Sequence, residues 1–135
     1  KTFGKGLELV WSPNNDYAVR ETPGKLVLFN NFVESGVLKM STPAEKIFGG
    51  YLLCAACAGG QLCFIDWASG QVVRRIDVDA RAVYWNETGS KVAVCTGDSV
   101  FILKYHQRLV QQVLSSASSA GQPIDEIEDA FEVVD

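Results

Sequence analysis

The stretch GQLCFIDWASGQVVRRID, residues 60–77, contains the clearest indication of the fold in this sequence. It predicts a strand over QLCFIDW, a turn at Ala68-Ser69-Gly70 and a second strand over QVVRRIDV. The preceding run YLLCAACA ends at Gly59-Gly60, and a two-residue hairpin loop requires the positive φ angles that glycine adopts without strain. With EKIF before it, this region predicts one unit of four short antiparallel strands.

The same unit recurs along the chain, because a shift of 37 residues superimposes the sequence on itself without a gap. The matched sets are Trp11, Phe48 and Trp85; Ala18, Ala55 and Val92; Val27, Phe64 and Phe101; and Leu28, Ile65 and Ile102. Such recurrence indicates three copies of one supersecondary unit that bury their apolar faces against each other. We therefore expect core packing for the tryptophans at this repeated position.

The three units are expected at about 7–43, 44–79 and 80–135. Their inner strands, such as YLLCAACA and KVAVC, are apolar almost throughout, whereas the outer strand QVVRRIDV is charged. This gradient is typical of propeller blades, in which neighbouring blades cover the inner strands. The predicted fold class is all-β, with about three four-stranded antiparallel blades of the WD-repeat type in one incomplete propeller.

The third unit departs from the pattern after Tyr105. Leu109, Val110, Val113 and Leu114 have helical spacing in HQRLVQQVLSSASSA, which predicts a short C-terminal amphipathic helix. The helix and a following linker are expected over about 106–124, and residues 130–135 could supply the missing fourth strand. A propeller needs roughly four to eight blades. We therefore expect a piece of a larger protein, with open blade edges.

Composition and charge exclude several functional classes. The 135 residues are 47% hydrophobic and 21% charged, as in an ordinary folded domain, and no apolar run reaches the roughly 18 to 20 residues of a membrane helix. The net charge of −4 is concentrated in the last eleven residues, which contain six acids and form either a solvated segment or an acidic docking strip. The remainder is near neutral. The sequence therefore predicts a cytosolic protein without a basic nucleic-acid stripe.

The cysteines, Cys54, Cys57, Cys63 and Cys95, are expected to be buried small side chains. Strand residues three apart point to opposite faces, so Cys54 and Cys57 should not share a ligand. If Gly59-Gly60 is the whole hairpin turn, Cys57 faces Leu62 and Cys63 faces Ala56, and no two thiols meet. We expect no metal site.

The carboxylates and the histidine do not predict catalysis. His106 is the only imidazole and is expected in a solvated linker. Asp66, Asp77 and Asp79 are expected as ordinary turn and strand-end carboxylates. No catalytic residue is predicted, and the chain is not expected to be an enzyme.

Two basic segments are also weak as ligand sites. Gly4-Lys5-Gly6 is too short for a phosphate loop, so no cofactor is expected. On a strand, Arg74 and Arg75 point opposite ways, so one should pair with a neighbouring strand. The other faces solvent, or a partner in the case of Arg75.

The runs GGYLL, FIDW, VRRI, FILKY and IEDAFEV closely resemble the coatomer beta-prime family of WD-repeat proteins, in its second propeller. The resemblance extends from about Trp11 to the C-terminus, and FILKY with the later DAFEV is its most specific part. Asp66 aligns with the Asp of the WD dipeptide, while Trp67 comes one residue late. This turn should close a strand pair and bury an indole. The coatomer alpha family is a related scaffold.

The resemblance implies a structural component of the COPI coat, in vesicle transport between Golgi and endoplasmic reticulum. It implies a cytoplasmic protein, peripheral to Golgi membranes and COPI vesicles, whose partners are other coatomer subunits, especially alpha. The alternative is a peptide-binding WD-repeat adaptor that reads dilysine cargo tails, a role associated in this family chiefly with the first propeller. Because the blades are unclosed, we also expect the chain to self-associate.

Overall fold

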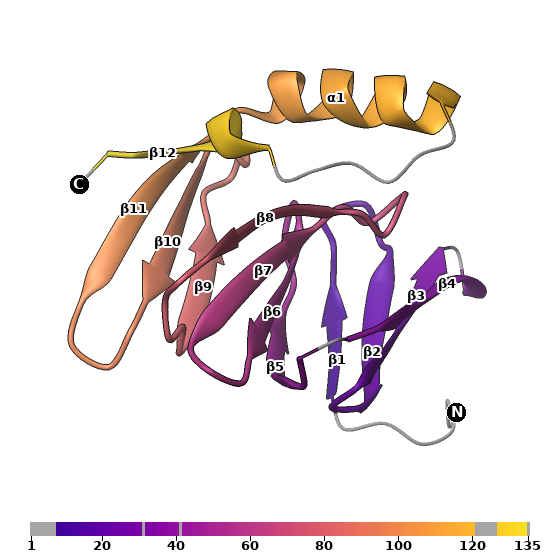
Figure 1. Ribbon diagram of the computed structural model, residues 1–135, viewed down its shortest axis with the longest axis horizontal. Coiled ribbons are helices and arrows are strands. Elements are labelled where there is room, and N and C mark those ends of the chain that lie inside the picture. The colour runs from indigo at the N-terminus through magenta and orange to yellow at the C-terminus, as the bar shows by residue number, and fades with distance from the viewer. Residues whose placement is uncertain (1–7, 31, 41, 121–126, 135) are drawn as a thin grey trace.

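The computed structural model describes residues 8–30, 32–40, 42–120 and 127–134. The described strands form three four-stranded antiparallel sheets, and consecutive strands pair in each (Figure 1). The first sheet contains β1 (Glu8–Trp11), β2 (Tyr17–Thr22), β3 (Lys25–Asn30) and β4 (Val33–Lys39). The second contains β5 (Ala44–Phe48), β6 (Leu53–Cys57), β7 (Gln61–Ile65) and β8 (Val72–Ile76). The third contains β9 (Ala82–Trp85), β10 (Lys91–Cys95), β11 (Val100–Tyr105) and β12 (Phe131–Val133).

The sheets stand side by side along the chain, from indigo to yellow in Figure 1, and pack through their faces. One buried cluster joins the first and second sheets, and another joins the second and third. All five residues of β6 are buried because both faces of the second sheet are covered. The predicted all-β class, built of propeller blades, is confirmed.

The third sheet is completed by the end of the chain. The α-helix α1 (Gln107–Ala120) and the 3-10 helix η1 (Glu128–Ala130) separate β11 from β12. Strand β12 returns to pair with β11, with Tyr105 opposite Phe131. The predicted helix and the predicted late strand are therefore both present. The expected linker at 121–124 lies outside the described residues.

The repeated aromatic position does not give three equivalent environments. Trp85 packs against the core between the second and third sheets, and Phe48 is buried in it. Trp11 pairs with Tyr17 on the face of β2 opposite to Ala18, which contacts the second sheet, and Trp11 is 49% exposed. Core packing is thus wrong for Trp11, because no described sheet covers that face.

Candidate functional site

The turn at Asp66 and Trp67 uses its polar groups internally. One carboxylate oxygen of Asp66, Oδ2, accepts hydrogen bonds from the backbone N–H of Ser69 at 2.9 Å and from its hydroxyl at 2.8 Å. The Trp67 indole is buried and donates from Nε1 to the Gly50 carbonyl at 2.7 Å. The turn closes β7 onto β8 and buries an indole, as predicted.

The other candidate carboxylates lie far from Asp66. Asp66 precedes β8, whereas Asp77 and Asp79 follow it. A strand of this length spans roughly 16 Å, at about 3.3 Å per residue. These carboxylates therefore do not form a pair for acid and base catalysis.

Two thiols meet, contrary to the sequence-based expectation. Cys57 pairs with Gln61 and Ala55 with Cys63, so the hairpin loop is Ala58, Gly59 and Gly60, not the glycine pair alone. This register puts Cys57 and Cys63 diagonally on one face, with their Sγ atoms 3.9 Å apart. Cys54 faces the other cluster, so the predicted divergence of Cys54 and Cys57 is confirmed.

The thiol environment favours the protonated form. Burial, followed by the neighbouring Cys63, raises the pKa of Cys57 to about 12, and Arg75 opposes this in part. Burial also raises the pKa of Cys54 well above its usual value. Within the described part of the chain, no group of three or more His, Cys, Asp or Glu side chains is placed to hold a metal ion. These thiols are therefore poor nucleophiles and act as core side chains.

The two arginines of β8 alternate as expected. Arg74 lies opposite Phe64 and Arg75 opposite Cys63, on the two faces of the strand. Arg75 lines a small cavity of about 80 Å³ together with Cys57 and Cys63. The Arg75 side chain is exposed, and its charge partly offsets the rise in the pKa of Cys57.

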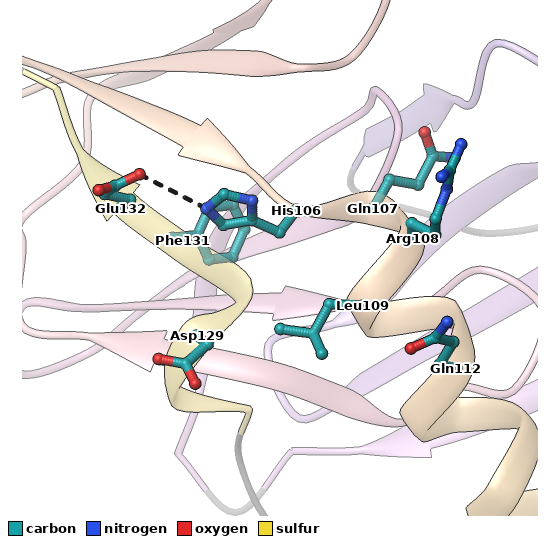
Figure 2. Close-up of a pocket in the computed structure, with 8 residues that line it drawn as sticks. All are labelled: His106, Gln107, Arg108, Leu109, Gln112, Asp129, Phe131 and Glu132. Atoms are coloured by element: carbon teal, nitrogen blue, oxygen red, sulfur yellow. Dashed lines mark ion pairs between the residues drawn. The ribbon is translucent and has the colours of Figure 1, made fainter.

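An open groove of about 720 Å³ lies where α1 begins and β12 returns (Figure 2). Its lining residues are His106, Gln107, Arg108, Leu109, Gln112, Asp129, Phe131 and Glu132. His106 joins β11 to α1, and its backbone N–H donates to the Ala130 carbonyl at 2.9 Å. Its Nε2 lies 3.6 Å from Glu132 Oε2.

The chemistry of this groove suits contact with another molecule. Leu109 points from α1 into the space between the helix and the segment that carries Asp129 (Figure 2). Asp129 and Glu132 supply carboxylates, and Arg108 supplies a guanidinium. The lining contains no Ser, Thr or Cys that His106 could activate. Sequence reasoning placed His106 in a linker and missed the groove, although the predicted strand at 130–135 was a signal that this segment returns.

Comparison with known proteins finds a family that matches the whole chain. The model of the COPA/B second beta-propeller family matches residues 1–135. "Coatomer subunit beta'-3" of Arabidopsis thaliana is 44% identical over 99% of this chain, which spans 14% of that relative. "Coatomer subunit beta'-1" of Oryza sativa subsp. japonica and "Coatomer subunit beta'" of Rattus norvegicus are 41% and 38% identical over 99% of this chain, which spans 15% of each.

Two solved structures are similar in fold alone. "Dihydro-heme d1 dehydrogenase NirN in complex with DHE" has a TM-score of 0.51 at 13% identity, covering 89% of this chain and 27% of that one. The periplasmic gluconolactonase PpgL of Pseudomonas aeruginosa has a TM-score of 0.52 at 15% identity, covering 95% of this chain and 42% of that one. In the described residues, no helix has the length and apolar character needed to cross a membrane.

Proposed function

Because this chain belongs to the COPA/B second beta-propeller family, we propose that it is a structural part of a COPI coatomer subunit. In this role it holds blade geometry and presents surfaces to other coat subunits during transport between Golgi and endoplasmic reticulum. The carrying observation is the family match over all 135 residues, together with relatives near 40% identity that are named coatomer subunits.

The internal organisation supports a scaffold role. The two apolar clusters join three sheets in series, and the polar groups of the Asp66 turn are used to hold the chain. The proposed partners are coatomer subunits, alpha among them, and the proposed location is the cytoplasmic face of Golgi membranes, reached through the coat. The role requires no enzymatic activity.

A chimera tests this proposal. The 135 residues replace the matching segment of the Arabidopsis beta'-3 subunit, and the chimera is captured from cells by an affinity tag. We expect the other coatomer subunits to co-purify with it in the amounts seen with the native subunit. A chimera carrying Val94→Asp places a charge at a fully buried position and should not fold. It is the negative control, which should lose any coat subunits that depend on the folded segment. A folded chimera without coat subunits would contradict the proposal.

The alternative, recognition of dilysine cargo tails, is tested separately. A dilysine tail peptide with a free C-terminal carboxylate is titrated against the purified chain, beside the same peptide with an amidated C-terminus. A scaffold should not distinguish the two peptides. Saturable binding that requires the free carboxylate would favour the adaptor function.

A further inference from the structure

Strand β12 has an open edge. Among the described residues it pairs only with β11. The His106 N–H donates to the Ala130 carbonyl, and the Val134 N–H donates to the Ile102 carbonyl. Alternate residues of an antiparallel strand direct their backbone groups to opposite sides. Phe131 and Val133 therefore direct their N–H and C=O groups away from the sheet.

The equivalent edge in the second sheet is occupied. Ile127, in an extended conformation, donates its N–H to the Val73 carbonyl of β8 at 2.8 Å. Strand β8 carries Arg74 and Arg75, and Ile127 is followed by the acids Glu128 and Asp129. In the described residues, the outer strand β8 is thus contacted by a segment of opposite charge at one backbone hydrogen bond.

Strand β12 is held in place for a similar contact. The Phe131 ring lies 4.3 Å from the Phe64 ring of the second sheet and 5.2 Å from the Tyr105 ring of the third. These contacts anchor the strand from within, while Val133 is 69% exposed. Ordering before binding reduces the entropy that a ligand must overcome.

The groove between the start of α1 and residues 129–132 contains charged groups of both signs. Its charged lining groups are the carboxylates of Asp129 and Glu132 and the guanidinium of Arg108, and His106 Nε2 lies 3.6 Å from Glu132 Oε2. Leu109 and Phe131 add apolar surface. Neighbouring sheets in this molecule pack through their faces. The outer edge of β12 therefore stays accessible when further blades flank the array.

We propose that the free edge of β12 and this groove form a docking site for an extended, basic segment of a partner protein. The segment adds to the third sheet beside β12 through main-chain hydrogen bonds to Phe131 and Val133. Its basic side chains approach Asp129 and Glu132, and its apolar side chains contact Leu109. The inference rests on the edge and the groove, and does not depend on the coat function.

The test uses the purified chain and a short fluorescent peptide of alternating lysine and valine, blocked at both ends. Fluorescence anisotropy should show saturable binding that weakens as salt is added, because the contact is partly ionic. The matching glutamate and valine peptide should bind at least about tenfold more weakly. A lysine and proline peptide keeps the charge but cannot form a strand, and it should not bind.

Protein variants locate the site. Val133→Pro removes an outward N–H without removing a hydrogen bond to β11, and should weaken binding at least about tenfold. Val133→Thr retains the N–H and is the matched control, with affinity near the native value. The double variant Asp129→Asn with Glu132→Gln should weaken binding severalfold and reduce its salt dependence.

Two results would overturn the inference. One is equal binding of the lysine and glutamate peptides. The other is undiminished binding to a folded Val133→Pro chain. If Val133→Pro does not fold, the double variant and the lysine and proline peptide decide the question. Because coat assembly is not measured here, failure of this test leaves the chimera result unaffected.

Discussion

At single residues, the indole N–H groups of Trp67 and Trp85 differ in whether they have a hydrogen-bond acceptor. Trp67 donates from Nε1 to the Gly50 carbonyl at 2.7 Å. Trp85 Nε1 is buried and has no hydrogen-bond partner among the described residues. Both indoles approach Gly50, where an added Cβ would lie 2.1 Å from Trp85 Cδ1. Glycine is therefore required at this position, and only one of the two indoles has its polar group satisfied.

The two tryptophans provide a matched pair of substitutions. Trp67→Phe and Trp85→Phe remove similar apolar area, but only the first breaks a hydrogen bond and leaves a carbonyl unpaired. We expect Trp67→Phe to lower the free energy of unfolding by about 1–3 kcal/mol more than Trp85→Phe does. Urea denaturation followed by circular dichroism measures both. Equal losses would show that the Trp67 hydrogen bond adds nothing.

The Cys57 thiol gives the stability a dependence on alkaline pH. Its pKa is raised to about 12 by burial and by Cys63, whereas an unfolded thiol titrates near 8.5. The folded state therefore binds the proton more tightly. This contribution to stability is complete below about pH 8.5 and is lost as pH rises towards 12.

We expect the free energy of unfolding to fall between about pH 9 and 11, and the fall to be smaller in Cys57→Ser. Denaturation at a series of pH values measures this slope. Cys95→Ser, at a partly exposed thiol outside the two buried clusters, is the control for the cysteine-to-serine exchange. An unchanged slope in Cys57→Ser would contradict the assignment.

At the scale of elements, packing holds α1 in place. Its first turn contains no acidic residue and its last turn no basic one, so charges do not support its ends. Val110 and Leu114 are buried with Ile127 and Ala130 in the cluster between the second and third sheets. Leu109, on another side of the helix, is 36% exposed in the groove. The buried side of the helix thus packs against the segment that returns to β12.

Two leucine substitutions, one on each side of α1, test this division of the helix. We expect Leu114→Ala to lower the free energy of unfolding by about 2–5 kcal/mol, because it opens a cavity in the core. Leu109→Ala should cost less than about 1 kcal/mol, because its side chain is already partly in water. Thermal and urea unfolding measure both. Similar losses would mean that the helix is not anchored through its buried side.

At the scale of the whole molecule, the two end faces of the array carry apolar rows. On the first sheet the register aligns Leu9, Val19, Val27 and Val37, on the face opposite to the second sheet. On the third sheet it aligns Tyr84, Ala93 and Ile102, also on the outer face. Val37 and Tyr84 are 42% and 64% exposed. These faces match the kind of surface that is buried between sheets inside the array.

We therefore expect the purified chain to self-associate with rising concentration through these faces. Val37→Lys and Tyr84→Lys should each shift the equilibrium towards monomer, because association would bury a charge. Glu45→Lys, at an exposed position in β5, is the control for added positive charge. Light scattering across a concentration series measures the mass. A native chain that stays monomeric at high concentration would contradict this expectation.

Local patterns in the sequence predicted much of this molecule. Helical spacing at Val110 and Leu114 predicted α1, and the turn residues after Asp66 predicted the closure of β7 onto β8. The near-continuous apolar run of β6 predicted a strand covered on both faces. Each of these inferences depends on residues close together in the chain, where propensity and periodicity act directly.

The all-β class, the repeated sheets and the late strand that completes the third one all follow from patterns in the sequence. Which side chains meet depends instead on how segments distant in the chain pack together. One extra residue in the loop before Gln61 brought Cys57 to Cys63. Trp11 is exposed because none of the described sheets covers its face of the first sheet. The return of β12 created the groove at His106. The physical reason is the period of two along a strand. A one-residue change in register turns a side chain to the opposite face, and the burial of that face depends on segments distant in the chain.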